Sequence, residues 1–192
     1  MHHDIWQGHN IRLRQLTSAD QHHLLASYDD SDTWRHADEI KFPVSEARIN
    51  ELITAQLSRQ DDNRLLAVAD ASDQLVGTIN VHGADRRHRT FEYGIHIFRS
   101  QRQKGYASEA IRLLLRYYFH ELGYHRVWAT VYSFNQPSVT LHHRLGFIEE
   151  GRLRQSLYAQ NRYWDELIFG LLADEAEEQI NKLPPLPLLH SD

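Results

Sequence analysis

A basic turn with a single glycine, Arg102-Gln103-Lys104-Gly105-Tyr106-Ala107, has residue types that could bind an anion. It follows an alternating stretch that predicts a strand over residues 91–98. It leads into an apolar stripe at helical spacing, which predicts a long helix that Gly123 ends. Backbone N–H groups at the start of a helix point to one spot and carry partial positive charge, so this turn is suited to a phosphate. Gly105 lets the backbone approach such a ligand closely, and Ala107 is nearly as small.

The turn does not match the common nucleotide-binding motifs. It lacks the Gly-Lys-Ser/Thr of a Walker loop, and with one glycine it is no dinucleotide-binding GxGxxG. Taken alone, it is more typical of an ordinary solvated turn than of a binding site.

The segments around the turn change this interpretation. They are Glu92-Tyr93-Gly94-Ile95-His96-Ile97 before it, Ser108-Glu109-Ala110 after it, and then Arg126-Val127-Trp128-Ala129-Thr130-Val131, Asn135-Gln136-Pro137-Ser138 and Leu145-Gly146-Phe147. Together they resemble the acyl-CoA-binding core of the GNAT N-acetyltransferase superfamily, over roughly residues 10–175. Residues 150–154 and Tyr163-Trp164-Asp165 resemble the branch of ribosomal-protein-alanine and spermidine (diamine) acetyltransferases.

The resemblance implies a single α/β domain with a central, V-shaped, mostly antiparallel mixed sheet flanked by about four helices. Acetyl-CoA, as co-substrate and without a metal, would lie where the fourth and fifth strands splay apart. Gln103 stands where family loops often carry glycine, so a positive φ there would strain it. Asn135 has helix capping as its alternative role. The residues implied in cofactor binding are Ile97, Arg102, Gln103, Lys104, Gly105, Tyr106, Ala107, Ser108 and Asn135.

Two residues are candidates for the catalytic proton transfers of acetyl transfer. Glu92 lies on the predicted fourth strand, where the family commonly carries the base; its alternative role is a surface charge. Counting back from Gly146-Phe147 places His142 where many members have a tyrosine acid, and an imidazolium could also protonate a thiolate. Tyr132 is the second candidate for that donor. His96 is interpreted as a pocket histidine, with base catalysis as the less favoured role.

The acceptor is expected to be a cationic amine, either a small amine such as a polyamine or a protein N-terminus. The family builds its acceptor site largely from the first helices and their loop, and an acidic rim with an aromatic face attracts cations. An ordinary solvated loop is the alternative. Two rival functions stay open: a non-catalytic acyl-CoA-binding regulator of the same fold, and a scaffold that binds another nucleotide phosphate. The predicted acceptor residues are Asp29, Asp30, Asp32 and Trp34, with Asp38 and Glu39 nearby.

The elements that must position these residues fit one domain of 192 residues and 22.6 kDa. We expect residues 1–177 to form it and residues 178–192 to be a proline-rich tail. Strands are predicted at 11–14, 65–69, 75–82, 91–98 and 126–132, with a final pair at 147–150 and 166–172. Helices are predicted to begin near Thr17, at Ser45 with a stripe of Ile49, Leu52, Ile53 and Leu57, and at Pro137, while residues 28–34 read as a loop.

Composition excludes several classes of function. The chain has 0 Cys, which excludes disulfides and thiolate metal sites, and its 14 His lack zinc-site spacing. A formal charge of −5 makes nucleic acid a poor partner. No stretch approaches the ~18 apolar residues of a membrane span, and no secretion signal is readable, so a cytoplasmic location is expected. A homodimer is left open.

Overall fold

The computed structural model describes residues 4–31, 34 and 42–185. Its centre is a seven-stranded sheet in the order β1-β2-β3-β4-β5-β7-β6. All neighbours are antiparallel except β4 and β5, which confirms the predicted mixed, mostly antiparallel sheet. The strands are β1 (Ile11–Gln15), β2 (Leu65–Asp70), β3 (Leu75–Asp85), β4 (Thr90–Ile97), β5 (Arg126–Tyr132), β6 (Ile148–Ala159) and β7 (Arg162–Leu172).

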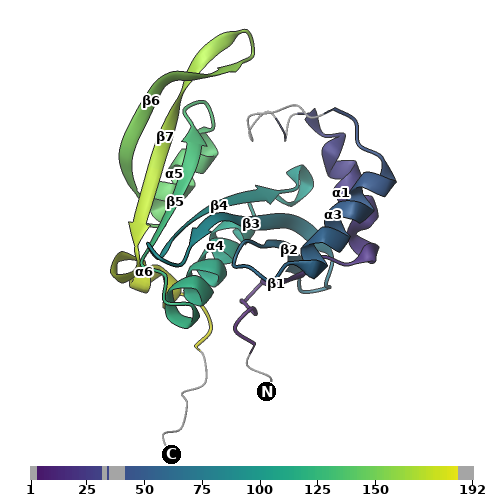
Figure 1. Ribbon diagram of the computed structural model, residues 1–192, viewed down its shortest axis with the longest axis horizontal. Helices are drawn as coiled ribbons and strands as arrows, with labels where there is room; N and C mark the ends of the chain where they lie inside the picture. Colours follow the sequence, from purple (N-terminus) through teal and green to yellow (C-terminus); the bar gives the residue numbers. More distant parts are fainter. Residues whose placement is uncertain (1–3, 32–33, 35–41, 186–192) are drawn as a thin grey trace, which may run out of the picture.

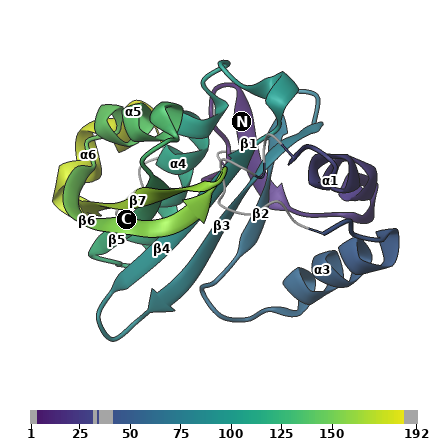
Figure 2. The ribbon, with the colours of Figure 1, turned by 90° about the horizontal axis from the view of Figure 1, so that it is seen from above.

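The helices cover the sheet unevenly. Figures 1 and 2 show α1 and α3 side by side at one end, the β6–β7 hairpin rising at the other, and α4 packed against the strands between them. The large apolar core lies around α4, and a smaller cluster lies beneath α1 and α3. The helices are α1 (Gln21–Tyr28), α3 (Glu46–Ser58), α4 (Tyr106–Arg116), α5 (Gln136–Arg144) and α6 (Ala173–Ile180), with short turns η1 (Ser18–Asp20) and η2 (Arg99–Gln101) and a π-helical turn η3 (Tyr117–Glu121).

The pairing of β4 with β5 stops early. The two strands run parallel and pair only through Thr90–Arg126, Phe91–Val127 and Glu92–Trp128. On its other edge β4 pairs with β3 as far as Gly77–Ile97. The parallel strands therefore diverge beyond Glu92, which is the predicted V.

Most predicted elements match in position. β5 has the predicted bounds, and Ser45 caps α3 by accepting a hydrogen bond from the Arg48 amide. Leu57 differs from the predicted stripe of α3, since it is 54% exposed beyond the last buried turn. Trp34 is helical rather than part of a loop.

The C-terminal part differs more from the prediction. The expected short strand pair is the start of a long hairpin, because β6 continues to Ala159 and β7 begins at Arg162. Helix α6 was not predicted, and residue 178, the expected start of the tail, lies inside it. Ile180 and Leu183 are buried in the main core. We therefore propose that the domain extends at least to Leu183.

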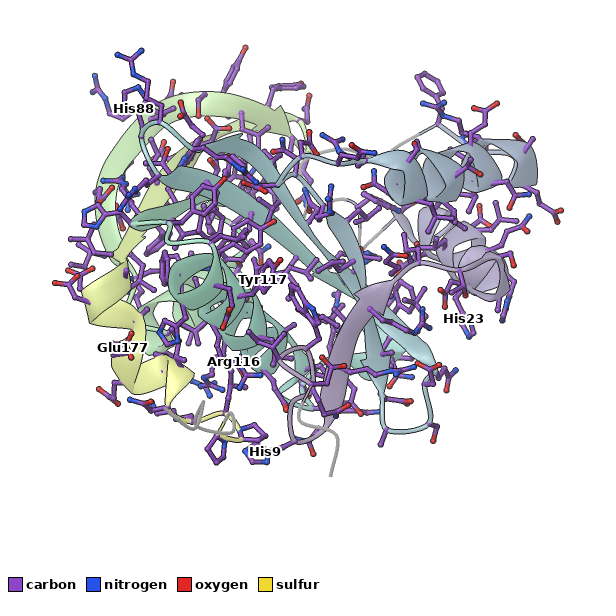
Figure 3. All side chains as sticks on the ribbon, turned by 60° about the horizontal axis from the view of Figure 1, so that its bottom comes forward. His9, His23, His88, Arg116, Tyr117 and Glu177 are labelled. Carbon is purple, nitrogen blue, oxygen red and sulfur yellow. The ribbon has the colours of Figure 1, made fainter. Side chains whose placement is uncertain are left out.

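A buried arginine on α4 holds segments from near both ends of the chain. The Arg116 guanidinium donates hydrogen bonds to the carbonyl oxygens of Ile5 and Gln7, and to that of Pro184 at 2.9 Å. Beside it, the ring of Tyr117 packs on Trp6 at 4.3 Å between centroids. Figure 3 shows Arg116 and Tyr117 together on this side of the molecule. The side chain is 3% exposed, so these carbonyls take the place of solvent around its charge.

Candidate active site

A cleft of about 800 Å³ opens where β4 and β5 separate. Its walls are residues 92–96 of β4, residues 129–132 of β5, the start of α5, and the facing parts of α1, α3 and β3. It brings together six residues that the sequence singled out for catalysis or binding: Glu92, His96, Tyr132, Asn135, His142 and Trp34.

Glu92 lies at the vertex of the split. Its carboxylate accepts a hydrogen bond from Thr130 Oγ1 on β5 at 3.4 Å, and its Oε2 is 3.1 Å from His82 Nε2 on β3. Burial raises the pKa of Glu92, and the attraction of His82 opposes that rise. A half-buried carboxylate with a raised pKa in a cleft has the properties of a general base.

His82 is a cleft residue that the sequence analysis missed. The strand pairing places it directly opposite Glu92, and Asn80 Nδ2 lies 3.1 Å from its Nδ1. The pairing register of β3 and β4 is a long-range property, and local periodicity does not specify it. The alternation of His82 with the buried Val81 was the one available signal, because it places His82 on the opposite face of the strand.

His142 is positioned as predicted, but its protonation differs from the expectation. It is 3% exposed, and burial lowers the pKa of its imidazole. Its Nδ1 lies 2.8 Å from the Ser138 carbonyl, which can only accept, so Nδ1 carries the proton. Nε2 then accepts from the Tyr93 hydroxyl at 2.8 Å. A neutral ring with a hydrogen bond at each nitrogen does not fit the expected imidazolium donor. Tyr132, the second candidate for that donor, lines the same cleft.

The basic turn has the backbone geometry of an anion site. Gly105 has φ +83° and begins α4, and none of the described side chains caps it. By contrast, Ser45 and Asn135 accept hydrogen bonds at the starts of α3 and α5. The first amides of α4 are thus left for another acceptor. Gln103 has φ +64°, the strained conformation anticipated for it.

The other side chains of the turn make local contacts. Arg102 Nε donates to the Ile97 carbonyl at 3.2 Å, and Lys104 Nζ donates to Gln101 at 2.7 Å. Ser108 Oγ donates to the Gly105 carbonyl at 2.8 Å. Tyr106 and Ala107 pack against the main core, and Ile97 is buried at the end of β4.

The expected acceptor residues are not all brought to the cleft. The Trp34 ring lies 4.8 Å from Tyr28 and 5.4 Å from His96, and all three line the cleft. Asp30 lines a neighbouring hollow of about 520 Å³, and Asp29 is exposed at the end of α1. Asp32, Asp38 and Glu39 lie outside the described residues.

Two guanidinium groups, those of Arg59 and Arg64, line the cleft. Arg59 pairs with Asp61 at 2.7 Å, and Arg64 lies 3.4 Å from the same carboxylate. These two cations offset part of the negative potential that Asp29, Asp30 and Asp32 would give the cleft.

Comparison with known proteins identifies the family. Residues 10–148 match the model of the acetyltransferase (GNAT) domain. The chain belongs to the GNAT acetyltransferase family. It is 37% identical over 174 residues to the SPbeta prophage-derived uncharacterized N-acetyltransferase YokL of Bacillus subtilis, covering 90% of this chain and 95% of that protein. It is also 33% identical to the putative ribosomal N-acetyltransferase YdaF of the same organism over 137 residues, 70% of this chain and 75% of that protein.

A solved GNAT structure in complex with CoA has the same fold. The spermidine N-acetyltransferase of Vibrio cholerae, in complex with CoA and spermine, superposes with a TM-score of 0.78 at 26% identity, covering 87% of this chain and 98% of that one. The GNAT family uses acetyl-CoA as acetyl donor, and the uncapped turn and the split between β4 and β5 fit such an elongated, phosphate-bearing molecule.

Two further observations concern only the part of the chain that the structure describes. None of its helices has the length and apolar character needed to cross a membrane. No group of three His, Asp or Glu side chains there is arranged to hold a metal ion.

Proposed function

We propose that this GNAT protein transfers the acetyl group of acetyl-CoA to a primary amine by direct attack in a ternary complex, with Glu92 as the base. The Glu92 carboxylate takes a proton from the ammonium group, the neutral amine nitrogen attacks the thioester carbonyl, and the carbon–sulfur bond breaks as the nitrogen loses its second proton to the cleft. The thiolate then takes a proton from the cleft. The position of Glu92 at the vertex of the split is the observation that carries this proposal.

Glu92→Gln tests the base directly. The amide cannot accept the proton, so kcat should fall by ~10²-fold or more, while the thermal stabilisation by CoA is retained. Glu177→Gln, on α6, is the control and should behave like the wild type. Full activity of Glu92→Gln would exclude Glu92 as the base.

The proton donor to the thiolate is a separate question. The neutral state of His142 favours Tyr132, so we propose Tyr132 as donor and His142 as the residue that orients Tyr93. Tyr132→Phe should lower kcat by ~10²-fold with little change in CoA affinity. If His142→Gln is the more damaging change in a folded protein, the donor is His142, as the sequence suggested.

The turn before α4 is proposed to bind the CoA pyrophosphate through backbone amides. Gly105→Val would place a branched side chain beside those amides at a positive φ, and should abolish stabilisation by CoA. Gly123→Val is a matched control, because Gly123 also has a positive φ, at +69°, and open space around its Cβ position. Both variants carry the same backbone strain, so CoA binding should distinguish them. Equal CoA affinity in the two variants would refute this assignment.

The acceptor is proposed to be a cationic amine drawn in by Asp29, Asp30 and Asp32 and packed against Trp34. The aromatic wall of the cleft and the spermine-bound relative support this proposal. The Asp29→Asn, Asp30→Asn, Asp32→Asn triple variant should raise KM for the amine at low salt and spare kcat. High salt should act similarly, because the Debye length is ~8 Å at physiological ionic strength.

The control for this charge change is Asp174→Asn, Glu177→Gln, Glu178→Gln on α6, which should leave KM unchanged. Two results would contradict the proposal that these acidic residues attract a cationic amine. One is an unchanged KM for the amine in the first triple variant, and the other is that the best acceptor found is an anion.

A further inference from the structure

We infer that His82 is a positioning residue that orients Glu92 and keeps its carboxylate ionised for proton abstraction. The inference rests on the proposed function, because it concerns the base of that reaction. Three observations carry it: the polar contacts on both carboxylate oxygens, the orientation of the imidazole, and the contrast in exposure between the two side chains.

The Glu92 carboxylate is held from both sides of the split. Its Oε2 faces His82 Nε2 on β3 at 3.1 Å, and its Oε1 faces Thr130 Oγ1 on β5 at 3.4 Å. The shorter contact comes from β3, which pairs regularly with β4 from Gly77–Ile97 up to His82–Glu92. His82 therefore holds the carboxylate relative to β3, the strand that pairs with β4 on the side away from the split.

Asn80 sets the orientation of the imidazole. Its Nδ2 donates to His82 Nδ1 at 3.1 Å, which leaves the ring proton on Nε2, the nitrogen that faces Glu92. Asn80 pairs across the strands with Gly94, where a Cβ would come within 2.8 Å of Asn80 Oδ1. The missing side chain at Gly94 thus gives Asn80 the room to hold His82.

The two side chains differ in their access to water. The Glu92 side chain is 17% exposed and that of His82 is 49% exposed. Burial alone would favour the protonated acid at Glu92, which cannot act as a base. A donor at Oε2 that remains in contact with solvent counters this effect, whether its ring is neutral or protonated.

Other titratable groups line the same cleft. Arg59 and Arg64 pair with Asp61, so part of their charge is neutralised there. His96 and His142 have pKa values lowered by burial and are neutral at pH 7. The remaining groups are the phenols of Tyr28, Tyr93 and Tyr132. His82 is the one described residue paired with the Glu92 carboxylate that can carry a positive charge.

The pH dependence of kcat/KM separates tuning of the base from mere structural support. It should be measured with acetyl-CoA and a weakly basic amine, so that ionisation of the amine does not mask that of the enzyme. In His82→Leu the acidic limb should move up by about one pH unit, since the donor that favours the charged form is gone. Activity should then fall by up to tenfold at pH values below both midpoints, and recover to the wild-type plateau at high pH. In His82→Gln, which keeps an N–H donor, the acidic limb should stay close to its wild-type position.

A matched control exists elsewhere in the protein. His120 and Glu177 form another exposed His–Glu pair at 2.8 Å, between η3 and α6. Figure 3 shows Glu177 on α6, away from the β3–β4 strands that carry His82. His120→Gln should leave the pH profile unmoved.

A second measurement does not depend on turnover. The carboxyl carbon of Glu92, followed by NMR in protein labelled at glutamate and assigned by its loss in Glu92→Gln, should titrate about one pH unit higher in His82→Leu than in wild type. An unmoved midpoint in a folded variant overturns the inference, even if the enzyme is active. Absence of acetyl transfer by wild type would instead contradict the proposed function, and the NMR titration would still decide the role of His82.

Discussion

The two edges of β4 are paired to very different extents, and the functional residues follow that difference. Toward β3 the pairing runs from Gly77–Ile97 to His82–Glu92 and, beyond an irregularity in register, includes Asp85–Thr90. Toward β5 it ends after Glu92–Trp128, and the cleft begins there. Strand β4 thus has a closed edge, which pairs with β3, and an open edge, which does not pair with β5 beyond Glu92. The open edge is suited to an extended ligand that adds to the sheet as a strand would.

The closed edge should be the less tolerant of substitution. A Cβ at Gly77 would collide with the carbonyl oxygen of His96 and lie 2.8 Å from Ile97 Cδ1. Gly77→Val should therefore lower the free energy of unfolding by about 3 kcal/mol or more, measured by urea denaturation. Gly94→Ala, on β4 itself, meets only the end of the Asn80 side chain and should cost less than half as much. Equal losses would mean that backbone approach does not distinguish the two sites.

Of the two edges of β4, CoA should protect only the open one. At a concentration of a hundred times Kd, it should stabilise the folded state by about 2.7 kcal/mol. Amide hydrogen exchange should then slow most at residues of β4 beyond Glu92 that face β5, while those bonded to β3 change little. Uniform protection of both edges would argue against ligand pairing with β4.

Acid sensitivity should also originate on the open side. Burial, with a contribution from Arg102, lowers the pKa of His96 to about 4. Since its unfolded pKa is about 6.5, the unfolded chain binds the proton more readily, and stability is lost as pH falls from 6.5 toward 4. At pH 5 this amounts to about 2 kcal/mol, and the lowered pKa of His142 acts in the same direction. His96→Phe should lose about that much less stability than wild type between pH 7 and pH 5. An identical loss in the variant would show that His96 contributes nothing to acid sensitivity.

The smallest expected effect is in the turn at the end of the open edge. Gln103 has φ +64°, which costs an L-residue about 1 kcal/mol, whereas glycine adopts it freely. Gln103→Gly also gains backbone freedom in the unfolded state, so the net stabilisation should stay below about 1 kcal/mol. Calorimetry with and without CoA would measure it, and a destabilised variant would mean that the Gln103 side chain makes a compensating contact.

The sequence predicted best the elements that pack one face against the core. Strands such as β5 alternate buried and partly exposed residues, and α4 has one continuous apolar stripe, so local periodicity was sufficient. The β6–β7 hairpin was predicted only at its base. Beyond Gly151 the outer strand β6 is exposed at every position except Leu157 and the final Ala159, and therefore has no apolar alternation to read.

The candidate site likewise contains some residues that the local sequence predicts and others that it does not. Glu92, Gly105 and His142 could be found from motif spacing, because each lies within a local segment. His82 could not, since its role depends on the register between β3 and β4. The protonation of His142 was also beyond the sequence, because it follows from burial and from bonds to Tyr93 and Ser138.

The arrangement around Arg116 makes the two chain ends dependent on each other. One guanidinium serves the carbonyls of Ile5 and Gln7 on one side and of Pro184 on the other, and it has no carboxylate partner among the described residues. If either segment detaches, water reaches the cation and the contact that holds the other segment weakens. Detachment of these two segments is then one cooperative opening rather than two independent ones, although most of the sequence lies between them.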